Sequence, residues 1–95
     1  MSVTTVPFAK FRLGRIVATP TALAYLTHED IRRGIERHQA GDWGDVGEED
    51  RKENEFSLTR RLRLFSVYHA ESGVKFWMIT EADRRSTRVL LPKDY

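Results

Sequence analysis

The sequence contains no cysteine, so it offers no disulfide bond, no thiolate zinc site and no cysteine nucleophile. Proline is also scarce, and no apolar run approaches the roughly 20 residues that a membrane-spanning helix requires. The first residues, MSVTTVPFAKFRLG, lack the charged start and apolar stretch of a signal peptide. We therefore expect a cytoplasmic protein that does not contact a membrane.

Apolar residues make up 40% of the chain and aromatic residues 11%. This composition indicates a folded protein, because disordered chains lack the apolar surface that offsets the entropy of ordering. A length of 95 residues is typical of one small domain. We expect a single domain over residues 1–95, with a flexible N-terminus over about residues 1–9.

Charge is distributed unevenly along the chain, although the formal net charge is only +2. Residues 1–27 carry basic side chains and no acidic one. Residues 42–55 are strongly acidic, with Arg51 and Lys52 as their only basic members, and residues 60–95 are again basic. Segregated charge of this kind steers a protein toward charged partners.

The N-terminal part of the chain predicts a strand followed by a short helix. FRLGRIVAT, residues 11–19, is expected to be an edge strand, because Gly14 weakens it and its arginines discourage aggregation. Thr19 and Pro20 are typical of a helix start, which predicts a short helix that ends near Leu26.

Two more helices are expected before residue 60. Thr27 and Asp30 form a shortened capping box, and Gly41 marks the end of that helix. The next helix is predicted from about Glu48 to Leu58, with Phe56 among its few apolar anchors.

From residue 61 the pattern alternates with a period of two. RLRLFSVYHA, VKFWMITE and TRVLL are separated by turn residues, which predicts three consecutive antiparallel strands. Turns centred on Glu71–Ser72 and on residues 83–85 would place opposing residues on one face. The core face would carry Phe65, Val67, Phe76, Met78, Val89 and Leu91. The outer face would carry Leu64, Ser66, Tyr68, Lys75, Trp77, Ile79, Glu81, Arg88 and Leu90.

The predicted fold class is therefore α+β. It consists of an N-terminal strand, two to three helices and then a three-stranded antiparallel meander, with the helices packed on one face. The outer face mixes bulky apolar and charged side chains, and such a face is expected to be covered by a partner.

HQAGDWGDVGEED, residues 38–50, allows two interpretations. A metal or hydrolytic site would use His38, Asp42, Asp45 and the glutamates that follow them, but their spacing matches no zinc or calcium pattern. An acidic turn between two helices, held in the core by Trp43, explains the same residues. We therefore expect no metal and no cofactor. The acidic surface of this turn would comprise Asp42, Asp45, Glu48, Glu49 and Asp50, and it would suit a basic partner.

Basic side chains in the strands and turns offer a second surface. They are Arg60, Arg61, Arg63, Lys75, Arg84, Arg85 and Arg88. With Tyr68, Trp77 and Tyr95 nearby, this mixture is typical of phosphate binding and base stacking. A solvated sheet edge explains the same charges without a ligand, and both interpretations stay open.

Three blocks, DWGDV, SVYHAESGVKFWMITEADRRST and LLPKDY, resemble a family of small bacterial proteins found on plasmids and other mobile elements. The likeness spans roughly residues 11–95, and its distinctive pattern is FWxITExDR followed by LLPxDY. The resemblance implies a mobile-element context and no particular activity.

The predicted order of elements is also similar to that of RelE/ParE-type toxins, which are ribosome-dependent ribonucleases or gyrase poisons. In the ribonucleases, basic side chains on the sheet and a C-terminal tyrosine or histidine serve phosphodiester cleavage. This resemblance would assign those roles to Arg61, Arg63, Lys75, Arg88 and Tyr95. It rests on architecture alone, because no motif aligns residue by residue.

The favoured hypothesis is a non-enzymatic protein-interaction module of a mobile element. It would inhibit a host defence or nucleic-acid-handling complex, such as CRISPR or restriction machinery. The partner-binding residues are expected to be Tyr68, Lys75, Trp77, Ile79 and Arg88, since aromatic anchors dominate interface energetics. A homodimer through the same face would cover it equally well. The alternatives are a toxin that acts on RNA or the ribosome, and a direct nucleic-acid binder.

Overall fold

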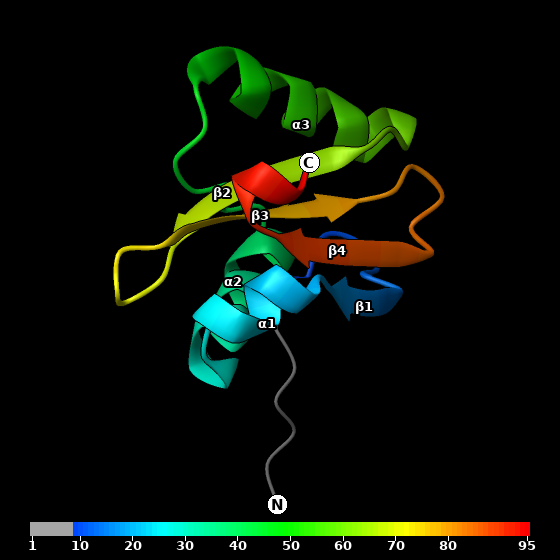
Figure 1. Ribbon diagram of the computed structural model, residues 1–95. Helices are drawn as coiled ribbons and strands as arrows, with labels where there is room; N and C mark the ends of the chain where they lie inside the picture. The colour runs from blue at the N-terminus through cyan, green and yellow to red at the C-terminus, as the bar shows by residue number, and fades with distance from the viewer. Residues whose placement is uncertain (1–8) are drawn as a thin grey trace, which may run out of the picture.

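Residues 9–95 form three α-helices and four β-strands, which confirms the predicted α+β class. Figure 1 shows the computed structural model, which describes residues 9–95. The predicted flexible N-terminus, about residues 1–9, lies outside the described residues apart from Ala9. In chain order the elements are β1 (Arg15–Ala18), α1 (Pro20–Tyr25), α2 (His28–Gln39), α3 (Glu48–Arg60), β2 (Leu64–His69), β3 (Lys75–Thr80), β4 (Ser86–Leu90) and the 3-10 helix η1 (Pro92–Asp94).

The four strands form one mixed sheet in the order β1-β4-β3-β2. β2, β3 and β4 are antiparallel neighbours, and β1 is an edge strand as predicted. β1 pairs in parallel with β4, from Arg15 opposite Ser86 to Ala18 opposite Val89. The predicted three-stranded meander is therefore incomplete. The fourth strand, β1, pairs with β4 from the other end of the chain, and such a long-range pairing leaves no trace in local sequence patterns.

The predicted register of the first hairpin is wrong by one residue. Ser66 pairs with Met78, so the loop between β2 and β3 contains one residue more than expected. Gly73 in this loop has a left-handed φ of 97°, which is typical of longer hairpin loops. A shift of one residue moves every side chain of a strand to the other face of the sheet.

The side chains of β2 are consequently exchanged between the two faces, whereas the faces predicted for β3 and β4 are confirmed. The core face carries Leu64, Ser66, Tyr68, Phe76, Met78, Thr80, Thr87 and Val89. The outer face carries Phe65, Val67, Trp77, Ile79, Arg88 and Leu90. Tyr68, expected on the outer face, is 2% exposed and donates its hydroxyl hydrogen bond to the backbone carbonyl of Asp42 (2.6 Å).

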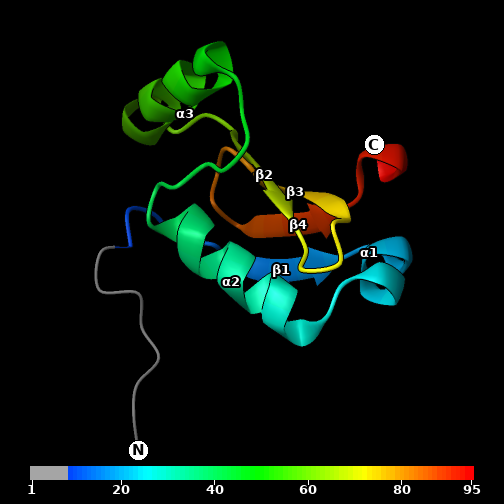
Figure 2. The same ribbon diagram turned by 90° about the vertical axis from the view of Figure 1, so that its left-hand side faces the viewer.

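α1 and α2 together cover the core face of the sheet (Figure 2). Ala22 and Leu26 of α1 and Ile31 and Ile35 of α2 pack against the apolar side chains of the strands. Burial of this apolar cluster supplies the main favourable term in the folding free energy.

α3 does not join the other two helices, which corrects the prediction that all helices pack on one face. It lies beside β2, on the far side from α1 and α2 (Figure 1). Its buried residues are Asn54 and Ser57, and Phe56, predicted to be an apolar anchor, is 50% exposed. α3 therefore has no apolar stripe that could pack against the sheet.

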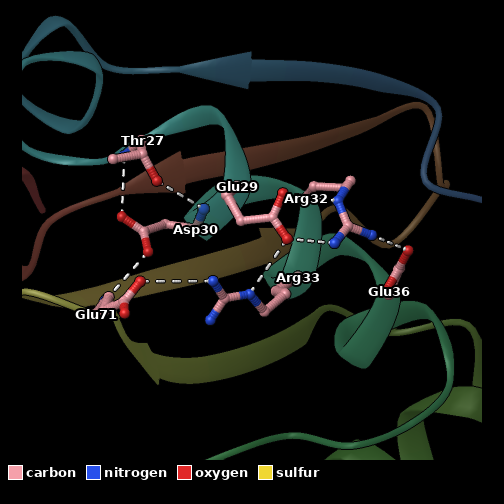
Figure 3. Close-up of polar contacts among 7 residues, drawn as sticks. All are labelled: Thr27, Glu29, Asp30, Arg32, Arg33, Glu36 and Glu71. Carbon is pink, nitrogen blue, oxygen red and sulfur yellow. Dashed lines mark hydrogen bonds and ion pairs between the residues drawn. The ribbon is translucent and has the colours of Figure 1, made fainter.

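The N-terminus of α2 is fixed by its cap and by the β2–β3 loop (Figure 3). The Thr27 hydroxyl accepts from the Asp30 N–H (3.0 Å), and the Asp30 carboxylate accepts from the Thr27 N–H (2.9 Å). The second carboxylate oxygen of Asp30 accepts from the N–H of Glu71 (3.2 Å), so one buried carboxylate links helix and loop. Exposed ion pairs surround this contact and involve Glu29, Arg32, Arg33, Glu36 and Glu71.

The outer edge of β2 is closed by polar contacts. The Asn54 side chain donates to the Phe65 carbonyl (2.7 Å) and accepts from the Phe65 N–H (3.0 Å), as a neighbouring strand would. Gly44 forms a β-bridge with Val67, whose N–H donates to the Trp43 carbonyl (3.0 Å). The predicted interhelical turn, with Trp43 only 4% exposed, therefore also protects an edge that would otherwise pair with other chains.

His38 is fully buried within a directed chain of hydrogen bonds. The Thr87 hydroxyl donates to the Leu13 carbonyl (2.8 Å), so it must accept from the Thr80 hydroxyl (2.8 Å). Thr80 in turn accepts from Nε2–H of His38 (2.8 Å), which leaves Nδ1 to accept from the Ser66 hydroxyl (2.5 Å). This chain is complete with a neutral imidazole.

Burial, together with the smaller effect of the positive charge of Arg84, lowers the pKa of His38 from its ordinary 6.5 to about 3. Both ring nitrogens are occupied by hydroxyl partners inside the core. His38 therefore serves as a structural residue, available neither as a metal ligand nor as a surface base.

We expect stability to fall as the pH drops below the ordinary histidine pKa. Between about pH 6.5 and 3, the unfolded chain protonates His38 while the folded protein keeps it neutral, so protons favour unfolding. Between about pH 7 and 5 this residue should remove about 2 kcal/mol from the free energy of unfolding. Urea unfolding across that range measures the effect. The control variant His28→Gln should show the same loss of stability at low pH as the unmodified chain. If His38→Gln also showed this loss, His38 would not be its cause.

We also expect Gly44→Ala to be more destabilising than Gly73→Ala. Both glycines have positive φ, which costs an alanine about 1–2 kcal/mol at either site. A methyl group at Gly44 would also lie 2.0 Å from the Val67 carbonyl oxygen, whereas Gly73 has open space around it. Such overpacking adds about 1–3 kcal/mol. Thermal unfolding of the two variants measures the difference, and equal losses would contradict the closed edge of β2.

Candidate functional site

A groove of roughly 960 Å³ lies between α3 and the outer face of the sheet. Its floor is apolar and consists of Phe65 from β2 and of Trp77 and Ile79 from β3. α3 borders one side, and the C-terminal segment with Tyr95 stands across the sheet from it (Figure 2). A volume of this size accommodates several side chains of a bound segment.

Three aromatic rings line the groove in a row. The rings of Phe65 and Trp77 meet edge to face at 5.1 Å between centroids, and those of Trp77 and Tyr95 at 5.6 Å. Phe65 and Trp77 are half-buried, and Tyr95 is 68% exposed. Edge-to-face packing holds these rings in place without covering them, so the groove is formed before a ligand arrives.

The α3 side of the groove is mainly acidic. Glu49, Asp50 and Glu53 line it together with Lys52. Within residues 9–95 these three carboxylates form no ion pair. Their charges therefore face solvent and are available to a basic ligand.

The side of the groove beneath Tyr95 is already paired. Arg63 donates to the Tyr95 hydroxyl (3.3 Å), and its Nε lies 3.6 Å from the Glu81 carboxylate. Arg88 lies 3.6 Å from the other oxygen of Glu81. The carboxylate of Glu81 thus offsets the charges of two arginines on this side. The excess of negative charge in the groove therefore lies on the α3 side.

The structure brings together some of the residues predicted to bind a partner and separates others. Trp77 and Ile79 lie in the groove. Tyr68 lies in the core on the opposite face because of the register shift. Lys75 is the first residue of β3 and pairs with His69, at the end of the strand away from Ile79. Arg88 lies beside the groove and forms an ion pair with Glu81.

The predicted acidic surface is likewise divided. Asp42 pairs with Arg37 (2.8 Å), and this hydrogen bond lowers the pKa of Asp42. Asp45 lies 3.1 Å from His69, and Glu48 pairs with Arg51 (2.5 Å). Glu49 and Asp50, in contrast, line the groove.

The residues that the toxin resemblance singles out do not form one cluster. Arg63, Arg88 and Tyr95 lie around Glu81, which offsets the charge of both arginines. Lys75 begins β3, whereas Glu81 follows its last residue, about 20 Å further along the strand. A phosphodiester would need these basic groups to converge on one phosphate.

Sequence reasoning missed several groove residues. Phe65 was assigned to the core by the register error, and Phe56 was expected to be buried. Glu53 and Asn54 carried no signal beyond ordinary helix composition. The sequence clue to the correct face of Phe65 was Gly73, in the loop between β2 and β3.

No α-helix of residues 9–95 combines the length and the apolar character needed to cross a bilayer. The sequence and structure match no known protein family, no curated protein sequence and no solved structure. The function is therefore argued from the geometry of the groove and from the charges around it.

Proposed function

We propose that this protein is a non-enzymatic interaction module whose groove binds an apolar segment of a partner protein. The observation that carries this proposal is the apolar floor between α3 and Tyr95, in which Phe65 and Trp77 are half-buried and Ile79 is buried. Exposed aromatic floors of this kind are typical of interface anchors, because rigid rings bury much area at a low entropic cost.

The charges of the groove specify the chemistry of the partner. Glu49, Asp50 and Glu53 have no ion-pair partner within residues 9–95 and lie along one side of the apolar floor. A partner segment with an apolar or aromatic side chain flanked by lysine or arginine would fill the floor and pair with these carboxylates. A partner with acidic flanks would be repelled.

Two observations favour binding over catalysis. His38, which precedes the acidic turn in the sequence, is neutral, and both its ring nitrogens are occupied inside the core. The arginines beside the groove, Arg63 and Arg88, share the carboxylate of Glu81. A catalytic interpretation would require groups that are free to act on a substrate.

The biological setting that we propose is inhibition of a host nucleic-acid-handling complex by a mobile element. Proteins that handle nucleic acids display basic surfaces, which fit the acidic side of the groove. The resemblance of the FWMITEADR and LLPKDY blocks to mobile-element proteins motivates this setting.

Capture from nuclease-treated bacterial lysate, followed by mass spectrometry, tests the proposal when it is combined with matched variants. The unmodified chain should retain a protein partner after nuclease treatment. Trp77→Ala should weaken that complex by about 30-fold or more, as expected for an interface anchor worth 2 kcal/mol. Glu49→Lys with Glu53→Lys should weaken it as well and leaves the core untouched.

Leu23→Ala is the control, because Leu23 is an exposed apolar residue of α1 (59% exposed) that does not line the groove. Capture that survives both Trp77→Ala and the charge reversals would contradict the proposal. So would a concentration-dependent dimer that Trp77→Ala abolishes, since the groove would then bind a second copy of this chain.

A further inference from the structure

Three segments that are distant in sequence meet at one end of the sheet. Arg15 at the start of β1 pairs with Ser86 at the start of β4, and its N–H donates to the Arg85 carbonyl (2.9 Å). The start of β2 pairs with the end of β3, Leu64 opposite Thr80. The end of α3, the β3–β4 turn and the start of β1 therefore lie together, on the right-hand side of Figure 1.

Arg84 of the β3–β4 turn holds these segments together. Arg84 is only 7% exposed. Its guanidinium donates hydrogen bonds to the backbone carbonyls of Leu62 (2.6 Å) and Ser57 (3.0 Å). It also donates within its own turn, to the carbonyl of Glu81 (3.1 Å), and lies over the ring of Phe11. Within residues 9–95 no carboxylate pairs with this buried charge, so its positive field extends to the surface.

Five exposed arginines surround Arg84 on these same segments, and we call them the arginine end. They are Arg12, Arg15, Arg60, Arg61 and Arg85. Within residues 9–95 none of the five forms an ion pair, although Arg60 lies over the ring of Phe56.

The arginines of the helices behave differently. Arg32 pairs with Glu29 and Glu36, and Arg51 pairs with Glu48 (2.5 Å). Exposed Arg32 on α2 and Arg51 in the first turn of α3 are therefore paired with carboxylates, whereas the arginines of the arginine end are unpaired within residues 9–95.

The dipole of α3 accounts for only part of this arrangement. A helix C-terminus favours positive charge, which would explain Arg60 and Arg61. It does not explain Arg12, Arg15 or Arg85, which come from other segments. Arg61 also occupies the left-handed position that ends α3 (φ 56°), where glycine is normally preferred.

We propose that the arginine end binds the phosphate backbone of a nucleic-acid duplex. Guanidinium groups match phosphate geometry and bind it in a bidentate manner. Among the residues described here, the aromatic rings at this end are Phe11, which is half-buried, and Phe56, which lies under Arg60. Base stacking is therefore a minor part of the contact, and binding is expected to be independent of base sequence.

The test is fluorescence anisotropy with a short, labelled DNA duplex of mixed sequence. If about four arginines contact phosphates, the logarithm of affinity should fall with the logarithm of salt concentration with a slope of about −4. Arg15→Ala with Arg85→Ala should reduce the slope by about 2 and the affinity at low salt by at least tenfold. Arg84 is left unchanged, because its loss would disturb the fold.

Arg32→Ala with Arg51→Ala is the matched control, since it removes the same net charge from exposed but paired arginines. Equal losses in the two double variants would overturn the proposal, because net charge alone would then explain binding. Equal affinity for polyglutamate would overturn it in favour of an acidic protein ligand. Trp77 lies in the groove and not at the arginine end, so unchanged duplex binding by Trp77→Ala separates this inference from the proposed function.

Discussion

The buried guanidinium of Arg84 fixes the relation between α3 and the sheet. It joins the carbonyls of Ser57 and Leu62, near the end of α3, to the turn between β3 and β4. A buried charge held by carbonyl oxygens is costly to leave unpaired, so this end of α3 is firmly attached. Both proposed binding surfaces border this contact: the groove lies along α3, and the arginine end lies around Arg84.

The groove exists because polar side chains and the backbone attach α3 to the rest of the fold. Asn54 attaches the middle of the helix to the edge of β2, and Glu55 accepts from the indole N–H of Trp43 (2.9 Å). A helix with an apolar stripe would pack onto Phe65 and Trp77 and bury them. α3 instead stays beside the sheet, and the apolar floor remains open to a partner.

Features governed by neighbouring residues were predictable from the sequence. The capping box of Thr27 and Asp30 and the buried Trp43 are confirmed, because helix ends follow local rules. The faces of β2 were not, since one additional loop residue, Gly73, reverses them. The sequence also could not identify Arg84 among many arginines, because its four carbonyl partners meet only in the fold.

We propose that the polar attachment of α3 leaves the molecule with two separate binding surfaces, the groove and the arginine end. Backbone-amide and indole NMR spectra recorded with two probes can distinguish them. The probes are a DNA duplex and a peptide that carries a tryptophan flanked by lysines. The duplex should shift signals of residues 12–15 and Arg85, and the peptide should shift those of Phe65 and the Trp77 indole. If both probes shift the same set of signals, the molecule has one binding surface, which would contradict the separation of the groove from the arginine end.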